Sequence, residues 1–492
     1  MVLGNRARRR ALSWSVALGA LSLTAACSSS HGDTASGTPS GGAGTTAGAS
    51  GALAGDGGAV SGGTSAAGGT AGSTASAGNA GNAGSAPTGG AGGATCTAEP
   101  PLMPSGATLD VTPPMTIASA LTKAVAGDRI VLHAGTYTSE QISKISHASH
   151  VFIEAAAGET VTLPGAHFTS CDHVVIDGVH FSGTLELDGS SDFVLRHLTL
   201  VGSGEDAALQ FQGQGSAGAS HDVEIEDSVI QGGGRTIFVL GRFAPSDQWN
   251  HHLNFVRNQI TCGSHNCFQI SGGRDLLIEN NELIGAGFSG VLTAGATRVN
   301  ISRNRFRGTR AVAMQIATPG MEWDNYAGVE NMISSEIVIA NNLVSGWDTG
   351  VLLDAATNVA IVYNTVADGE GVHFDHRTPH DQSNQVILNG NGDIRIWNDI
   401  LPSISIATGE AQPSFESNDL VWKSGGAGAN LVTADPQLDA ASDYALGPSS
   451  PALGAALVNA ETPLVDFENR PRGDDPDIGA RELGAPAPEC PN

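Results

Sequence analysis

The stretch Phe255-Val256-Arg257-Asn258-Gln259-Ile260 contains the pattern from which the fold can be predicted: an apolar residue, two spacers, Asn, one spacer and a second apolar residue. The pattern recurs at Asn-to-Asn steps of 23, 23, 38 and 22 residues, so a unit near 22 repeats and one unit carries a long insert. A unit this short cannot bury its own apolar face and must stack on its neighbours. The further copies centre on Asn281, Asn304, Asn342 and Asn364, with looser ones around Asp227 and Asn398.

Short runs rich in Val, Ile and Phe lie between the Asn patterns, and Gly and Asn separate them, which predicts strands and not helices. Stacked in register about 4.8 Å apart, such coils form parallel sheets, and an Asn at the same turn of every coil can bond to the next. We therefore expect an all-β protein, a single-stranded parallel β-helix (solenoid) with an internal Asn ladder. The runs are 236–239, 267–270, 290–293, 313–316, 350–353 and 371–374.

The N-terminus carries four arginines and then an apolar stretch that is too short for a mature transmembrane helix, so residues 1–26 are expected to be a secretion signal. The sequence ending at Cys27 resembles a bacterial lipoprotein cleavage box, although Thr24 stands where an apolar residue is usual. The resemblance implies lipidation of Cys27, and Ser28 after it fits outer-membrane sorting. We expect an exported protein, lipid-anchored at the outer membrane or cell surface, with plain secretion as the alternative.

Composition separates the remaining parts of the chain. Residues 27–100 are almost wholly Gly, Ala, Ser and Thr and predict a flexible linker. We expect an N-terminal cap and first coil over 101–149, the repeats over 150–430 and a C-terminal tail or cap over 431–492. The formal charge of −26 leaves no basic stripe for a phosphate backbone, so nucleic acid is not an expected partner. We expect a monomer that meets the membrane only through its N-terminal lipid.

The cysteines fit an oxidising compartment. Cys262 and Cys267 bracket a four-residue turn and are expected to form a disulfide. The alternative is a metal site formed by both cysteines and His265. The partners of Cys96, Cys171 and Cys490 are open.

The segment from Ile117 to Tyr137 resembles the opening of pectate-lyase-type right-handed β-helix proteins, in which a short amphipathic helix caps the solenoid. Ile117, Leu121 and Ala124 share one helical face, as such a cap requires. The tail resembles that of surface-anchored bacterial β-helix proteins of the "choice-of-anchor" kind. The resemblance implies a right-handed β-helix but does not fix a function, because such solenoids host lyases, hydrolases, epimerases and binding proteins. The tail residues that carry it are Asp435, Pro436, Tyr444, Ser450, Pro451, Asp466, Arg470, Asp477 to Ala480 and Glu482.

Alternation within the strands predicts one outward row that suits an extended sugar chain: Glu186, Gln210, Phe238, Gln269, Leu292, Gln315, Leu352 and His373. Three inserts, 242–250, 318–334 and 375–384, follow the same strand position and should wall one side of this row. Their aromatic residues can stack on sugars beside carboxylates, or can simply fold each insert onto its coil. The expected substrate-binding residues are Trp249, Glu322, Trp323, Asp324, Tyr326, Gln269 and Gln315.

The densest chemical cluster runs from Gly371 to Ser383, where a histidine base and an arginine anchor suit proton abstraction beside a uronic carboxylate, and where a metal is an alternative. Part of it, 379–383, is similar to the Asp-Pro-His-Asp/Glu signature of alginate C5-epimerases, but Thr378 replaces the leading Asp. The next coil, 401–409, offers no second acid. Paired-acid hydrolysis is also open. The candidate catalytic residues are His380, Asp381, Asp375, Arg377, His373 and Asp354.

These patterns predict a protein that binds polysaccharide. Whether it also processes the polymer, as a uronate lyase, a hydrolase or a C5-epimerase, is open. The alternative from another class is a non-catalytic surface structural protein or adhesin. Whether the protein is an enzyme is undecided at this stage. Metal ligands and cofactors are unknown, with calcium as one option.

Overall fold

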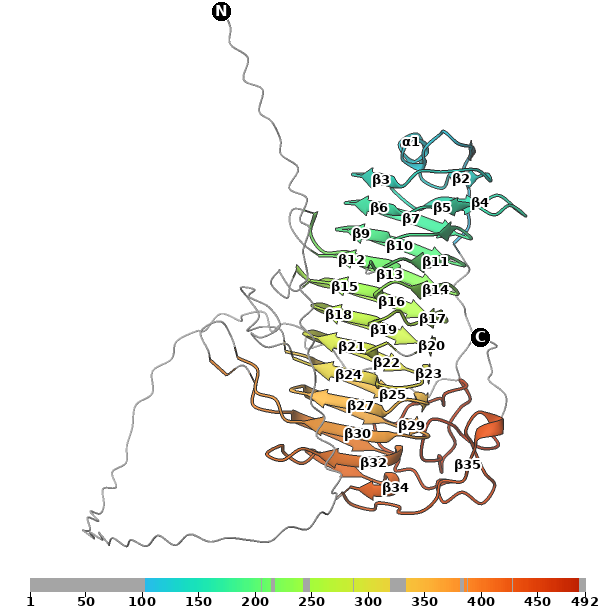
Figure 1. The fold of residues 1–492 in the computed structure, drawn as a ribbon. Coiled ribbons are helices and arrows are strands. Elements are labelled where there is room, and N and C mark those ends of the chain that lie inside the picture. The colour runs from blue at the N-terminus through green and yellow to red at the C-terminus, as the bar shows by residue number, and fades with distance from the viewer. Residues whose placement is uncertain are drawn as a thin grey trace, which may run out of the picture. The chain divides into compact units, whose positions relative to one another are not determined.

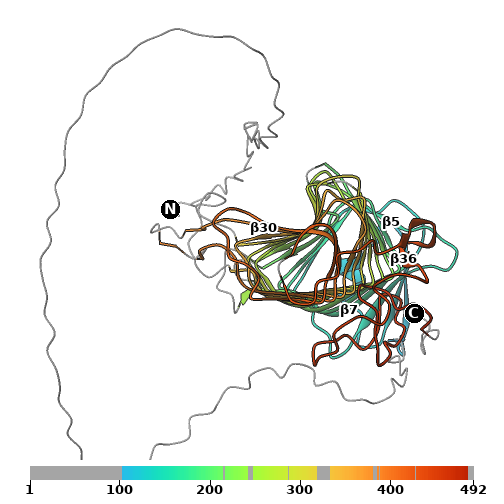
Figure 2. The ribbon, with the colours of Figure 1, turned by 90° about the horizontal axis from the view of Figure 1, so that it is seen from below.

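The computed structural model describes residues 102–204, 206–213, 217–241, 248–285, 287–318, 333–380, 385–386, 388–426 and 428–485. These residues form a right-handed parallel β-helix, in which each coil stacks on the previous one from the helix α1 (Ile117–Leu121) to the last coil, as Figure 1 shows. Figure 2 looks along the axis, so successive coils overlie one another. The predicted fold class and the capping helix are confirmed.

One long sheet takes a single strand from every coil and is parallel throughout. Its strands are β1 (Thr108–Val111), β2 (Arg129–Leu132), β4 (Val151–Ala155), β7 (Asp172–Asp177), β10 (Ser191–Arg196), β13 (His221–Glu226), β16 (Asn250–Val256), β19 (Gly273–Glu279), β22 (Ala296–Ser302), β25 (Ser335–Ala340), β28 (Thr357–Val362), β31 (Gly392–Trp397) and β33 (Phe415–Ser417).

The remaining strands of the coils form two further faces, which merge where β32 (Ile400–Ile406) pairs with strands of both. The face after the Asn turn contains β5 (Thr162–Leu163), β8 (His180–Phe181), β11 (Thr199–Gly202), β14 (Val229–Gly232), β17 (Gln259–Thr261), β20 (Glu282–Ile284), β23 (Arg305–Arg307), β26 (Leu343–Ser345) and β29 (Thr365–Val366). The other contains β3 (Glu140–Ser143), β6 (Ala166–Thr169), β9 (Leu185–Asp188), β12 (Leu209–Gln212), β15 (Arg235–Leu240), β18 (Asn266–Ser271), β21 (Ser289–Ala294), β24 (Val312–Ala317), β27 (Thr349–Asp354) and β30 (Glu370–Asp375). β34 (Leu420–Gly425) follows β32 in the merged sheet.

The Asn ladder is present and lies in the interior. The side-chain amide of Asn258 donates to Asn281 Oδ1 at 3.0 Å, and Asn281 donates to Asn304 Oδ1 at 3.0 Å. Asn304 donates to Asn342 at 3.2 Å and Asn342 to Asn364 at 3.0 Å, so the five patterns form one continuous row. Each amide therefore satisfies a buried neighbour, as buried polar groups require.

The residue before each rung has a positive φ, which turns the chain sharply from one strand into the next. The angle is 55° at Asn280 and 53° at Arg303. The looser copies of the pattern were expected around Asp227 and Asn398. In the structure the ladder positions of these two coils are each one residue later, at Ser228 and Asp399. Asp419 adds a further rung by accepting from the Asp399 amide at 2.8 Å.

Apolar side chains fill the interior along the whole axis, and those predicted to point inward, such as Leu209, Phe268 and Met314, are fully buried. At the N-terminal end Ile117 and Leu121 of α1 are buried over the first coils. The Thr116 side chain caps α1 by accepting from the Ser119 amide at 3.1 Å. The predicted disulfide between Cys262 and Cys267 is also present, and Cys171 is a buried free thiol. Cys27, Cys96 and Cys490 lie outside the described residues.

The C-terminal tail packs against the turns of the last coils. It contains β35 (Leu438–Asp439), the short 3₁₀ helix η4 (Ala440–Ser442) and β36 (Ala445–Leu446), visible beside the coils in Figure 1. Arg472 is buried within it, over the Tyr363 ring at 4.1 Å, and it donates to Asn341 Oδ1 at 2.8 Å. Gly479 donates to the Asn398 carbonyl at 2.8 Å. Of the tail residues singled out from the sequence, Gly479 thus contacts these turns directly, as does Ala480, whose amide donates to Thr365 Oγ1 at 2.9 Å.

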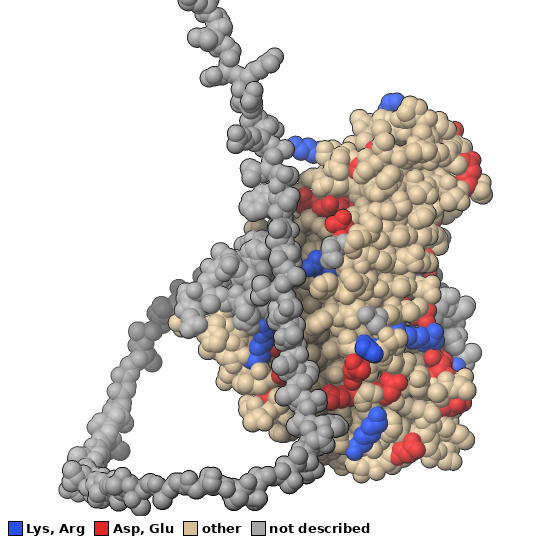
Figure 3. Space-filling view, in the orientation of Figure 1, with Lys and Arg blue, Asp and Glu red and all other residues tan. Residues whose placement is uncertain are grey.

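On the described part of the face in Figure 3, blue Lys or Arg side chains lie beside red acidic ones. Within the described residues Arg257 pairs with Asp227 at 2.8 Å. None of the helices in the described part of the chain has the length and hydrophobicity of a membrane span.

Candidate functional site

The outward row predicted from alternation is one continuous register column. It begins at Gln141 on β3 and ends at Ser405 on β32, and each member pairs with the next in the parallel ladder. The column consists of Gln141, His167, Glu186, Gln210, Phe238, Gln269, Leu292, Gln315, Leu352, His373 and Ser405.

The middle of this column is buried, whereas both ends are accessible. Gln269 is 8% exposed, Leu292 3% and Gln315 6%, although all three point away from the core. His167 and Glu186 at one end, and His373 near the other, are only partly buried. A ligand can therefore meet the described column directly at its two ends.

The residues expected to bind substrate do not all face solvent. Gln269 Oε1 accepts from Arg235 Nε at 2.6 Å and from Asn266 at 3.2 Å, so this amide serves internal bonds. Trp249 is 1% exposed, in agreement with the alternative in which a Trp folds onto its coil, and its ring is not available for stacking. Gln315 Oε1 is buried without a hydrogen-bond partner among the described contacts. Glu322, Trp323, Asp324 and Tyr326 lie outside the described residues.

The three inserts leave the solenoid from equivalent strand ends. Leu240 pairs in register with Ser271, Ala317 pairs with Asp354, and Asp354 pairs with Asp375. The ends of β15, β24 and β30 therefore line one edge of the sheet that bears the outward column. The inserts themselves lie mostly outside the described residues.

The predicted catalytic residues that the structure describes gather at the C-terminal end of the column. Arg377 Nη1 donates to Asp354 Oδ2 at 3.0 Å, and both side chains are largely buried, with 18% and 9% exposed. Asp375, the register neighbour of Asp354, is exposed. Since Asp354 is held against a guanidinium while Asp375 faces water, the two acids occupy different electrostatic environments.

Two histidines of this cluster are held by polar partners on the following coil. His373 Nδ1 lies 2.6 Å from Ser405 Oγ, and His376 Nδ1 lies 3.2 Å from Glu410 Oε2. The Glu410 side chain is only 2% exposed, and its other oxygen accepts from the Asn391 amide at 2.9 Å. Glu410 therefore orients the ring of His376, in the way a buried acid orients a catalytic base.

Glu410 is not among the residues predicted from the sequence, since it lies one residue beyond the segment 401–409, which contains no acid. The signal that could have found it is position, because Glu410 follows the strand that pairs with β30. The backbone of His380 forms a bridge with Val386, which places it in the same loop, and Asp381 lies outside the described residues.

A second group of titratable side chains lies at the N-terminal end of the column. His167 Nε2 is 3.7 Å from Glu186 Oε1, and Asp188 follows Glu186 on the same outward face of β9. Burial, together with the charge of Glu186, raises the pKa of Asp188 above its ordinary value. Asp188 was not selected from the sequence, although it stands two residues after Glu186.

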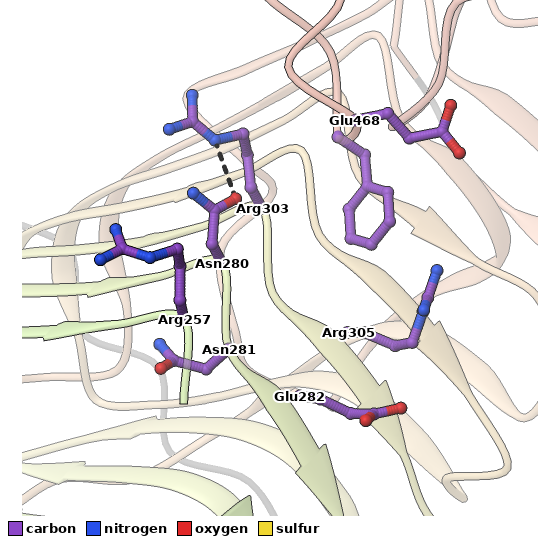
Figure 4. Close-up of a pocket in the computed structure, with 8 residues that line it drawn as sticks. Arg257, Asn280, Asn281, Glu282, Arg303, Arg305 and Glu468 are labelled. Carbon is purple, nitrogen blue, oxygen red and sulfur yellow. Dashed lines mark hydrogen bonds between the residues drawn. The ribbon is translucent and has the colours of Figure 1, made fainter. Parts of the chain in front are cut away.

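A polar pocket lies on a different side, where the turns before the ladder rungs face the tail. Figure 4 shows Arg257, Asn280 and Arg303 on three successive coils, with Glu468 of the tail opposite them. Arg303 Nε donates to Asn280 Oδ1 at 3.3 Å. Because Arg257 and Arg303 already pair with acids of the preceding coils, we assign no ligand to this pocket.

Within the described residues no group of three or more His, Cys, Asp or Glu side chains is arranged to hold a metal ion. Cys262 and Cys267 are bonded to each other in the disulfide, so their thiolates are not available for the alternative metal site with His265.

Comparison with known proteins agrees with the fold. Residues 246–420 match the family described as "Right handed beta helix region". The sequence matches no curated protein. The solved structures that resemble this chain have low sequence identity to it, so they indicate its fold and not its activity.

Three solved structures illustrate the similarity. The pectate lyase Pel9A is 14% identical, with 75% of this chain and 91% of that chain covered and a TM-score of 0.38. PfbA, a surface adhesin of Streptococcus pneumoniae, is 12% identical, with 64% and 86% covered and a TM-score of 0.42. The PL6-family alginate lyase AlyGC is 14% identical, with 70% and 55% covered and a TM-score of 0.44.

Proposed function

We propose that this protein is an exported, polysaccharide-binding β-helix that acts on a uronate-containing chain at the C-terminal end of its outward column. The observation that carries the proposal is the convergence of Asp354, His373, Asp375, His376 and Arg377 at the end of a register column that runs along the solenoid. A sugar chain is extended and polyhydroxylated, so it fits a linear row of polar side chains better than a closed pocket.

The chemistry that suits these residues is proton abstraction from the carbon beside a uronic carboxylate. His376 is the base that the geometry favours, because the buried Glu410 fixes its Nδ1 and leaves Nε2 to accept the proton. His380 of the same loop is the base proposed from the sequence. Arg377 would anchor the substrate carboxylate by exchanging part of its contact with Asp354. Loss of the proton followed by cleavage of the glycosidic C–O bond gives a lyase product, and return of a proton from the other side gives an epimer.

The test is incubation of the full chain with a panel of uronate polymers, read by ultraviolet absorbance for unsaturated products and by deuterium exchange at C5. His376→Ala and His380→Ala each remove one base candidate, and His197→Ala, at a histidine in the turn after β10 several coils away, is the matched control. We expect one of the two base variants to lose turnover while His197→Ala keeps it. Turnover that is unchanged in both base variants places the chemistry elsewhere.

A non-catalytic surface protein or adhesin is the rival function. The observation that favours it is the burial of Gln269, Leu292 and Gln315, which interrupts the accessible column. Binding of a protein partner with no binding to any glycan of an array would support this rival.

The N-terminal features extend the proposal to localisation. We propose export through the signal at 1–26, lipidation at Cys27 and a linker over 27–100 that connects the lipid to the solenoid. The tail of the "choice-of-anchor" kind and the monomeric state belong to the same proposal.

A further inference from the structure

The Asn ladder does not end in Asn. Its last two rungs are Asp399 and Asp419, and both side chains are completely buried. Asp399 Oδ1 accepts from the Asn364 amide nitrogen at 2.6 Å and from the Asn364 side chain at 2.9 Å, as an Asn rung would. Asp419 Oδ1 accepts from the Asp399 amide at 2.8 Å in the same manner.

The second oxygen of each acid stands where an Asn rung carries its NH₂ group. In the Asn rungs this group donates to a backbone carbonyl of the preceding coil, as Asn304 donates to Ile278 at 2.7 Å and Asn364 to Ile339 at 2.9 Å. Asp399 Oδ2 and Asp419 Oδ2 are buried and have no hydrogen-bond donor within reach among the described residues. A carboxylate there would point a negative oxygen at positions that hold acceptors, whereas a neutral acid offers an O–H in place of the amide N–H.

We propose that Asp399 and Asp419 are neutral carboxylic acids in the folded protein and form a proton-dependent latch on the last coils. Each acid donates its O–H in the position of the missing amide and so continues the ladder. When these protons are lost at higher pH, two adjacent buried carboxylates face each other and the last coils loosen.

Among the described residues, the groups that act on this pair add no compensating charge. The charged groups that act on Asp419 are Asp399 and Glu416, both acidic, and Asp399 is hydrogen-bonded by the uncharged Asn364 and Trp397 backbone. Burial raises the pKa of Asp399 to about 8, and burial with the neighbouring Asp399 raises that of Asp419. In an unfolded chain an Asp titrates near 3.9.

The sign of the pH effect follows from these values. Because the folded pKa lies above the unfolded one, the contribution of the pair to stability is complete below about pH 4 and is lost as the pH rises through about 8. The coil that loosens contains β32. This strand carries Ser405, the partner of His373, and leads to Glu410, the partner of His376. The latch would therefore tune the region where we place the reaction, although it depends only on the ladder and not on that function.

The experiment compares wild type with the double variant Asp399→Asn, Asp419→Asn, which supplies permanent amide donors and retains the size of both side chains. Thermal midpoints of the full chain are measured from pH 4 to pH 9, and hydrogen exchange is followed in the peptides of 400–425 and 250–300. Asp474→Asn, at an exposed acid of the tail, is the control.

We expect the advantage of the double variant over wild type to be smallest at pH 4 and to reach several degrees at pH 9. After correction for the intrinsic exchange rates, hydrogen exchange of wild type should accelerate from pH 4 to pH 9 at least tenfold more in 400–425 than in 250–300. In the double variant the two segments should accelerate equally. Infrared difference spectra should show a protonated carboxyl band at pH 6 that the variant lacks. Parallel pH curves for wild type and variant, or no such band at pH 6, would overturn the proposal.

Discussion

Replacing Asn304 by Ala removes one rung from the centre of the ladder, and its cost can be worked from the contacts. The Asn281 backbone N–H donates to Asn304 Oδ1 at 2.9 Å and would be left buried without an acceptor. The Ile278 carbonyl and Asn342 Oδ1 would each lose a donor. A buried orphan costs about 1–3 kcal/mol and each of the other two losses about 1 kcal/mol, so we expect a total of about 3–5 kcal/mol.

Urea unfolding followed by circular dichroism measures this cost, with Asn300→Ala as the matched control. Asn300 lies on β22 of the same coil but is exposed, so its substitution should change the free energy of unfolding by less than about 0.5 kcal/mol. Hydrogen exchange should show that the loss is centred on the coils around 281 and 342. If the two variants are equally stable, the ladder does not contribute as the hydrogen bonds imply.

Three further predictions concern the disulfide, the site and the N-terminus. Cys262→Ser opens a loop with a sequence separation of 5, and by the loop-entropy relation it should cost about 2 kcal/mol in chemical denaturation; no loss would mean that the bridge constrains nothing. Glu410→Gln should reduce turnover on the active uronate polymer and shift its pH profile through His376, whereas Glu410→Ala should also weaken the 375–391 loop in limited proteolysis; an unchanged profile in both would exclude Glu410 as a positioning residue. Cys27→Ala should abolish metabolic labelling with a fatty acid, and labelling that persists would exclude Cys27 as the acylated residue.

The fold could be predicted from the sequence because its determinants are local and repeat. A coil of about 22 residues buries its apolar side chains only against adjacent coils, so the same short pattern must return at every turn. The disulfide was predictable for a similar reason, since a four-residue turn leaves two cysteines few alternatives. The repeat also sets the register between neighbouring coils. The predicted order of residues in the outward column from Glu186 to His373 is therefore confirmed by the strand pairing.

The accessibility of the site was less predictable, because alternation states only which way a side chain points. Gln269 and Leu292 point outward as expected, yet both are buried, since a residue can face away from the core and still be covered. Trp249 shows the same limit, because the sequence places it in an insert but does not state whether the insert presents or buries it. Glu410 was not predicted because its role depends on a contact between coils, with His376, which lies 34 residues away in the sequence.

The end of the ladder shows most clearly how position outweighs residue type. The repeat selects an Asn because that turn needs one acceptor and one donor, and Asp399 and Asp419 meet the same two demands only if each keeps a proton. The substitution of acid for amide is therefore neutral in shape but not in chemistry, since it makes the bond between the last coils depend on pH. An Asn repeat that ends in two buried acids thus joins the stability of the terminal coils to their protonation, and the coil affected is the one whose Ser405 and Glu410 hold the histidines of the proposed site.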